Sequence, residues 1–249
     1  MRRFITTSLN GSEPGQRVAL SRREAHHLSR VTRLAVGEVC ELLDGEGRRA
    51  RARVEALAPD AVVLRQEGRV EARPAAHARL TVAQAIPKRQ VLDFIVEKAQ
   101  ELGVERLIPL ESARTEARPD AARFGRMRAR FERIAREAAK QSGNPRLVCV
   151  EEPAAFERLL ARAGEFDRGW ILTPGAELKL AEALERARAA AKEGGWKALL
   201  VIGPEGGFTQ EEERAARAAG VEPARLTEHV LRADTAFVAA AGLVRALLP

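Results

Sequence analysis

From Arg79 to Leu248, short apolar segments alternate with segments of helical spacing. When strands and helices alternate in this way, each helix returns the chain across a face of the sheet, so consecutive strands run parallel. The sequence therefore predicts an α/β domain with a parallel sheet over residues 78–249. The expected strands are residues 79–86, 105–112, 146–152, 169–175, 197–203 and 222–228, and the expected helices are residues 90–103, 120–142, 153–164, 177–193, 209–220 and 233–248.

Residues at helix ends support this assignment. Gly103 is a predicted C-cap, and Pro153 is predicted to start a helix. Thr209 and Glu212 have the T-x-x-E spacing of a capping box, which predicts a helix beginning at that point.

The first 70 residues look β-rich and predict a small barrel or sandwich. Residues 39–57 form two strand-like runs around Asp44-Gly45-Glu46-Gly47, a strong hairpin signal, and residues 61–69 form another strand. A short helix is expected over residues 22–30, with Ser21 as its N-cap. The linker between the two predicted domains is placed at residues 71–77, which contain Pro74.

Charge favours a polyanionic partner. The 249-residue chain has a formal net charge of +7, and the excess is concentrated in residues 1–77 and 114–146. Arginine outnumbers lysine 36 to 6, and its planar guanidinium suits phosphate groups and base edges. Cys40 and Cys149 lack metal-binding or CxxC spacing, so two unpaired thiols, no metal and a cytoplasmic location are expected. Neither a membrane span nor a signal peptide is expected.

The glycine-rich turn in "LLVIGPEGGFTQEE" is the first candidate site. Ligands of parallel sheets bind at the carboxyl ends of strands, where this turn lies. Gly203, Gly206 and Gly207 allow close backbone approach, and the helix capped by Thr209 points its N-terminus toward the turn. No lysine follows Gly207, so the turn is not a Walker A loop, and its position late in the chain differs from a Rossmann fingerprint. An ordinary strand-to-helix connection remains the alternative.

Several blocks, in order along the chain, resemble one enzyme family. "LVIGPEGGFTQEE" and "RLTEHVLRADTAFVAAAGLV" resemble the C-terminal signature of the SPOUT methyltransferases, and specifically the ribosomal RNA small subunit methyltransferase E family. "RRFI" and "HHLSRVTRLAVGE" resemble the PUA-like RNA-binding barrel of that family. "KRQVLDFIVEKAQELGVERLIPLESART" and "EAAKQSGNP" resemble parts of its catalytic domain.

The resemblance implies a methyl donor, S-adenosylmethionine, which leaves as S-adenosylhomocysteine. It also implies a deep trefoil knot in the C-terminal domain, a homodimer, and methylation of N3 of a uridine in 16S ribosomal RNA, within the small ribosomal subunit. The donor would be held by three loops. Their residues here are Leu172, Thr173, Pro174 and Gly175; Ile202, Gly203, Pro204, Glu205, Gly206 and Gly207; and Leu226, Thr227, His229, Val230 and Leu231.

The third loop departs from the family pattern. Thr227 stands where the family usually has glycine, and His229 where it has arginine. Ala233 and Asp234 replace a Thr-Glu pair. Thr227 adds a Cβ atom at a position where the family avoids one, so a change in the geometry or donor affinity of this loop is expected.

Two residues are predicted to serve catalysis. Uridine N3 must lose its proton before it attacks a methyl group, and the resulting negative charge spreads to O2 and O4. Arg232 matches the family arginine and is expected to stabilise that charge, with a helix-end salt bridge as the alternative. Glu205 is expected to orient the base or accept a proton, with a solvated turn carboxylate as the alternative.

Arginines in the two basic regions are candidate RNA contacts. Most would bind phosphate, which adds affinity without reading sequence; a solvated surface is the alternative for each. The target uridine would be unstacked or flipped out to reach the donor. The candidates are Arg2, Arg3, His27, Arg30 and Arg33 in the barrel, and Arg114, Arg123, Arg126 and Arg130 beyond it.

Three other functions stay open from sequence. A SPOUT enzyme acting on tRNA or 23S RNA would share all the donor chemistry. A catalytically silent RNA-binding protein of the same fold would account for the altered stretch from Thr227 to Asp234. A nucleotide-binding α/β enzyme is disfavoured by the missing P-loop lysine.

Overall fold

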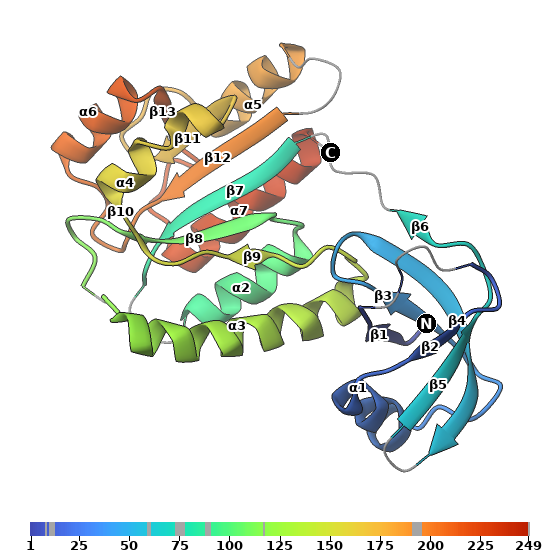
Figure 1. Ribbon diagram of the computed structural model, residues 1–249. Coiled ribbons are helices and arrows are strands. Elements are labelled where there is room, and N and C mark those ends of the chain that lie inside the picture. Colours follow the sequence, from blue (N-terminus) through green and yellow to red (C-terminus); the bar gives the residue numbers. More distant parts are fainter. Residues whose placement is uncertain are drawn as a thin grey trace. The chain divides into compact units, whose positions relative to one another are not determined.

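The structure is a computed structural model that describes residues 1–7, 9, 13–58, 61–72, 78–87, 91–116, 118–190 and 196–248 (Figure 1). Its contacts divide the chain into two compact units. The first comprises Met1–Pro74 and Arg136–Leu147, and the second comprises Ala75–Ala135 and Val148–Pro249. Helix α3 (Ala121–Ser142) therefore contributes residues to both units. In the predicted linker, residues 73–77 lie outside the described residues, and 71–72 form a short strand.

The first unit is built on one mixed sheet with the order β1-β3-β4-β5-β2, and β6 also pairs with β4. The expected hairpin is confirmed, because β3 and β4 are antiparallel across residues 44–47. Its turn is closed by Asp44, whose Oδ1 accepts from the backbone N–H groups of Glu46 (2.7 Å) and Arg48 (2.9 Å). The strands are β1 (Arg3–Ile5), β2 (Arg17–Ala19), β3 (Val39–Leu43), β4 (Arg48–Ala58), β5 (Ala61–Gln66) and β6 (Glu71–Ala72).

The predicted short helix of this unit is present as two consecutive segments, an α-helix followed by a π-helix. Helix α1 (Arg22–His26) starts after Ser21, whose Oγ accepts from Glu24 N at 3.4 Å. The chain then continues as a π-helix, η1 (His27–Thr32). It ends at Arg33, which has a left-handed φ of 51°.

The C-terminal turn of α3 packs into the first unit, which the sequence did not indicate. Ala139 joins a small cluster with Ile5 and Leu43. After the helix, Leu147 N donates to Gly45 O at 2.9 Å, so the chain also contacts the hairpin turn.

The second unit contains the predicted parallel sheet, with the order β10-β8-β7-β12-β11-β13, and β9 also pairs with β8. Every pairing in it is parallel. The strands are β7 (Ala78–Ala85), β8 (Arg106–Glu111), β9 (Cys149–Val150), β10 (Ala154–Ala155), β11 (Arg168–Leu172), β12 (Trp196–Ile202) and β13 (Val221–Ala224).

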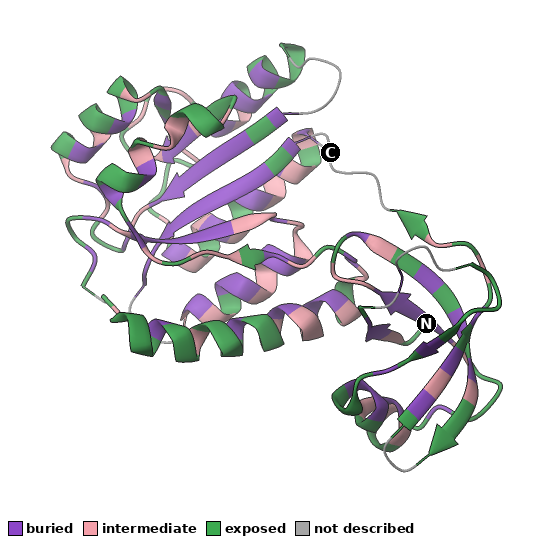
Figure 2. Cartoon of the chain, in the orientation of Figure 1, coloured by how far each residue is buried: buried purple, intermediate pink, exposed green. Residues whose placement is uncertain are grey.

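Helices cover this sheet on both faces, which is why its central strands are almost continuously buried (Figure 2). Alternate residues such as Leu199 and Val201 pack with Phe156 and Ala216 from α4 and α6. Helices α2 and α7 contact each other, and α7 also packs against β7 and β12. The helices are α2 (Val91–Glu101), α4 (Phe156–Leu160), α5 (Leu180–Ala189), α6 (Gln210–Ala218) and α7 (Ala233–Leu247), with a 3₁₀ turn, η2 (Ala163–Glu165).

Helix ends confirm two predictions and correct one. After α2, Gly103 has φ of 68°, and Val104 N bonds to Ala99 O at 2.8 Å, as expected of a glycine that ends a helix. The capping box of α6 is present. Pro153 does not start a helix: Ala154 and Ala155 extend the sheet by pairing with the end of β8, so α4 begins only at Phe156. No helix in the described ranges is long and apolar enough to cross a membrane.

Candidate functional site

The three predicted donor loops follow three neighbouring strands. Strand β11 lies between β12 and β13 and is parallel to both, with Leu172 paired to Ile202 on one side and to Ala224 on the other. The carboxyl ends of these strands therefore lie side by side at one edge of the sheet. The structure thus brings together residues 172–175, 202–207 and 226–231, although they are far apart in sequence.

Hydrogen bonds join the first loop and the residues just after it to the residues that immediately precede the third loop. Thr173, which is buried, donates its N–H to Ala224 O at 3.0 Å. Beyond it, Leu180 N donates to Arg225 O (2.8 Å). Arg225 N donates to Leu178 O (2.9 Å), and the Arg225 guanidinium donates to Ala176 O at 3.1 Å. These bonds hold the two loops in a fixed arrangement.

The glycine-rich turn is held tight by a hydrogen bond within it and by side chains that pack against its glycines. Gly207 has φ of 68°, and its N–H donates to Pro204 O at 2.9 Å. A Cβ atom on Gly203 would lie 3.0 Å from the Phe208 ring. On Gly206, a Cβ atom would lie 3.3 Å from Arg114 Cδ. Packing alone therefore requires Gly203, whereas the space beside Gly207 is open.

Glu212 and Arg114 fix this turn to the segment that follows β8. The buried Glu212 carboxylate accepts from Thr209 N and from Ala113 N, both at 2.8 Å. Arg114 donates to the backbone oxygens of Gly206 (2.5 Å) and Phe208 (3.2 Å). Arg114 was predicted to contact RNA, but its guanidinium holds the turn in this structure. The capping-box motif indicated Glu212, although it gave no sign of the bond to Ala113.

Thr227 fits the third loop without strain. Its hydroxyl donates to His229 O at 2.7 Å and accepts from His229 N at 3.3 Å, which closes a short turn. Arg33 is the non-glycine residue with positive φ in the described ranges, so Thr227 does not occupy a conformation reserved for glycine. Beside it, His229 is exposed, and Val230 is 77% exposed, which leaves an apolar side chain at the surface of the site.

Arg232 is available for a ligand. It is the exposed N-cap residue of α7, and its guanidinium has no hydrogen-bond or ion-pair partner among residues that the structure describes. The nearby Asp234 carboxylate accepts from the backbone of Thr235 at 2.8 Å. The alternative role of Arg232 in a helix-end salt bridge is therefore not observed. Glu205 is exposed within the glycine-rich turn.

The predicted RNA contacts of the first unit differ in their availability. Arg3 donates to Glu41 (2.7 Å) and to the carbonyls of Lys140 and Gln141, so it has a structural role. His27 is half-buried and packs edge-on against Phe4, with ring centroids 6.0 Å apart. By contrast, three predicted arginines are exposed and have no side-chain partner in this part of the structure: Arg2, Arg30 and Arg33.

The remaining predicted contacts lie on α3. Arg123 and Arg126 are exposed, and neither side chain has a partner among the described residues. Arg130 forms an ion pair with Asp93 of α2. The described ranges contain no cluster of three or more His, Cys, Asp or Glu side chains that could bind a metal ion.

Two family matches specify the class of protein to which this fold and these loops belong, the RNA methyltransferases. A profile described as "RNA methyltransferase domain" matches residues 74–245, and one described as "RNA methyltransferase PUA domain" matches residues 20–67. The first match covers the parallel sheet, and the second covers strands β3, β4 and β5 of the N-terminal sheet.

Individual relatives specify the family further. The ribosomal RNA small subunit methyltransferase E of Mycobacterium bovis is 34% identical, over 90% of this chain and 84% of its own length. Its Bacillus subtilis counterpart is 28% identical over 94% and 92%. The crystal structure of the Neisseria gonorrhoeae enzyme of the same name, bound to S-adenosyl methionine, has a TM-score of 0.84 and 26% identity, covering 99% of this chain and 98% of the other. The chain belongs to the ribosomal RNA small subunit methyltransferase E family.

Proposed function

We propose that this protein transfers a methyl group from S-adenosylmethionine to N3 of a uridine in 16S ribosomal RNA. The observation that carries the proposal is the convergence of residues 172–175, 202–207 and 226–231 at one sheet edge, next to Arg232, whose side chain has no partner among the described residues. Family membership supports the RNA substrate, and the Neisseria relative bound to S-adenosyl methionine supports the donor. A ribosomal RNA substrate implies that the protein works in the cytoplasm.

The residues at the edge suit the donor. Leu172, Leu226 and Val230 offer partly or largely exposed apolar side chains for an adenine ring, and backbone groups of the three loops can bond its polar edges. The open side of Gly207 allows close approach. When bound, S-adenosylmethionine supplies a methyl group that its sulfonium has already activated.

Two residues of the chain, Glu205 and Arg232, then act on the uridine that accepts the methyl group. The new bond joins uridine N3 to the methyl carbon, the carbon–sulfur bond breaks, and the N3 proton leaves to water or to Glu205. Arg232 stabilises the negative charge that develops on the uridine oxygens, as preorganised donors do in other enzymes. Because Arg232 has no partner in the described ranges, no internal ion pair must break before it binds the base.

Free arginines would hold the RNA. Arg2, Arg30 and Arg33 of the first unit, and Arg123 and Arg126 of α3, are exposed and lack side-chain partners in the described ranges. Such groups bind phosphates and make affinity depend on salt. We extend the proposal, on the family resemblance, to a homodimer and to a trefoil knot in the second unit.

The proposal is tested by a methylation assay with radiolabelled S-adenosylmethionine. Small ribosomal subunits, large subunits and tRNA from a strain lacking the gene are the substrates, and nucleosides are analysed afterwards. We expect N3-methyluridine in small subunits alone. Label in tRNA or large subunits would refute the substrate but keep the donor. A folded protein that labels none of them would instead be a silent RNA-binding protein.

A further inference from the structure

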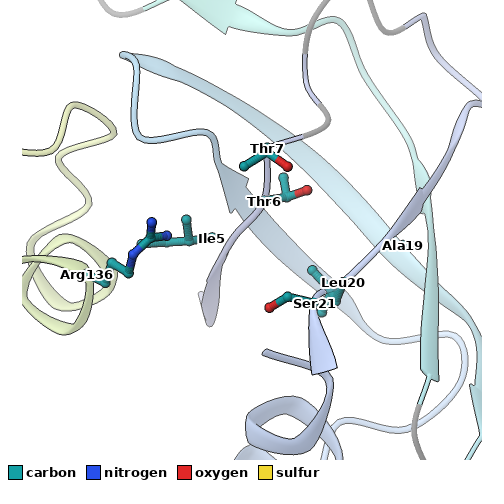
Figure 3. A pocket seen from close by; sticks show the side chains of 7 residues that line it. All are labelled: Ile5, Thr6, Thr7, Ala19, Leu20, Ser21 and Arg136. Carbon is teal, nitrogen blue, oxygen red and sulfur yellow. The ribbon is translucent and has the colours of Figure 1, made fainter. Parts of the chain in front are cut away.

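A pocket in the first unit lies outside the proposed catalytic site. It is a hollow of about 300 Å³ that opens between the end of β1, the end of β2 and helix α3 (Figure 3). Its polar lining residues are Thr6, Thr7, Ser21 and Arg136, and its apolar lining comes from Ile5, Ala19 and Leu20. All of these residues belong to the first unit.

Arg136 is the charged group of this pocket. Figure 3 shows its side chain extending from α3 toward Ile5. It is half-buried, and no described residue forms a hydrogen bond or ion pair with its guanidinium. Lys140, one turn further along the same helix, is paired with Glu24 at 3.3 Å and Glu137 at 2.9 Å. A guanidinium that is partly withdrawn from water and has no partner favours binding of an anion.

Hydroxyl groups can complete an anion site beside it. Thr7 is exposed, and its hydroxyl has no partner in the described part of the unit. Ser21 Oγ accepts from Glu24 N at 3.4 Å, so its O–H remains able to donate to a ligand.

The buried carboxylate of Glu24, which bonds to the backbone of the lining residue Ile5, does not oppose an anion. Glu24 does not line the pocket, and its charge is compensated by Lys140 Nζ at 3.3 Å and by the N–H of Ile5, also at 3.3 Å. The lining residues include no carboxylate. Of the residues that line the pocket, Arg136 alone is charged.

We propose that this pocket binds one phosphate group of the RNA backbone, with the Arg136 fork on the phosphate and Thr7 and Ser21 as further donors. A base is a poorer occupant because no aromatic side chain lines the pocket for stacking. The hollow is at the small end of ligand sites, which suits one group of a longer chain. The inference rests on the proposed function for the presence of RNA.

The test measures binding of full-length small-subunit ribosomal RNA by filter binding, for the wild type, Arg136→Gln and Arg51→Gln. Arg51 is an exposed arginine of β4 without a described side-chain partner, so its variant makes the same charge change away from the pocket. Between about 50 and 200 mM salt, we expect Arg136→Gln to bind about three- to tenfold more weakly and to lose roughly one unit of the log–log salt slope. We expect Arg51→Gln to bind like the wild type.

Further variants define the site. Thr7→Val should weaken binding about twofold, in line with the loss of one neutral donor. Equal losses for Arg136→Gln and Arg51→Gln would show a general charge effect and overturn the proposal, as would no loss for either. Isothermal titration with inorganic phosphate tests whether the pocket binds a free phosphate ion instead of an RNA phosphate. If Arg136→Gln abolishes saturable phosphate binding but leaves RNA binding intact, the pocket is a site for a free anion, and the proposal is wrong.

These outcomes distinguish a failure of the pocket proposal from a failure of the proposed methyl transfer. RNA binding is read without methyl transfer, so a wild type that binds RNA but methylates nothing would refute the proposed reaction and leave the pocket standing. Thermal melting of each variant confirms folding. Arg136 forms no described side-chain bond, so its substitution should leave the melting temperature within a few degrees.

Discussion

Charged residues at the amino ends and at the carboxyl ends of the parallel strands differ in whether other side chains pair with them. At the amino edge, Arg106 and Arg162 share the carboxylates of Glu151 and Glu165, with Arg162 Nη1 2.8 Å from Glu151. Arg106 also lies over the Phe166 ring. At the carboxyl edge, Arg232 has no partner among described residues, and Glu228, His229 and Val230 are exposed.

Under the proposed function, the amino-edge cluster maintains the fold and the carboxyl edge binds the ligands. Within this cluster of Arg106, Arg162, Glu151 and Glu165, ion pairs satisfy the charges, so these side chains have little to offer a ligand. At the carboxyl edge, Arg114, Glu212 and Arg225 are bonded within the protein, whereas Arg232 has no described partner, so no described internal bond must break before it binds a ligand. If the contrast is functional, variants at the two edges should separate activity from stability.

The largest expected effect comes from the carboxyl edge. Arg232→Ala should lower the single-turnover rate of methyl transfer to small subunits by about a hundred- to a thousandfold, because a donor to developing charge is lost. Donor affinity, measured by isothermal titration, should stay close to wild type. Arg217→Ala on α6 is the matched control, since Arg217 is also exposed and unpaired among described residues. Wild-type turnover in Arg232→Ala would break the assignment.

The second effect belongs to the amino edge. Arg245 donates to the backbone oxygens of Leu102 (3.0 Å), Ala78 (2.6 Å) and Gly103. Arg245→Ala should lower the free energy of unfolding by about 2–4 kcal/mol, because several charge-assisted bonds are lost. Denaturant unfolding measures this, with Arg217→Ala as control. Below the melting range, the rate of methyl transfer should be unchanged; a loss of rate without a loss of stability would contradict the contrast.

A smaller effect is expected within the glycine-rich turn. In Gly203→Ala the new Cβ would lie 3.0 Å from the Phe208 ring, so the ring or the turn must move. We expect donor binding about tenfold weaker, with a stability loss of about 1–2 kcal/mol from overpacking. Gly164→Ala is the control because its Cβ would meet nothing within 4 Å. Equal donor affinities in the two variants would show that the turn tolerates a side chain.

The smallest effect is on acid stability. The bond from Arg162, followed by smaller contributions that include Arg106, lowers the pKa of Glu165 below its usual 4.5. A lowered folded pKa stabilises the protein above the unfolded pKa, and this contribution is lost as pH falls through the folded value. On acidification below pH 4.5, the melting temperature of Glu165→Gln should therefore fall less than that of the wild type. Glu228→Gln, at the carboxyl edge, should follow the wild type; identical acid profiles for all three proteins would exclude a role for the network.

Local patterns predicted much of the fold. The hairpin at Asp44–Gly47, the helix end at Gly103 and the capping box of Thr209 and Glu212 all depend on residues close in sequence, and all are confirmed. Pro153 was misread because Ala154 and Ala155 pair with a distant strand. A pairing partner more than forty residues away leaves no mark on local spacing, so tertiary contact overrode helix propensity there.

The sequence by itself determined the alternation of strands and helices, the glycine-rich turn and the motifs that identify the family. Only the tertiary structure decided which arginines are free. Arg3, Arg114 and Arg232 look alike in sequence, but folding bonds the first two to distant backbone oxygens and leaves the third without a described partner. The physical reason is that a guanidinium reaches across several ångströms to whichever acceptors the fold brings near, and those acceptors lie far away along the chain.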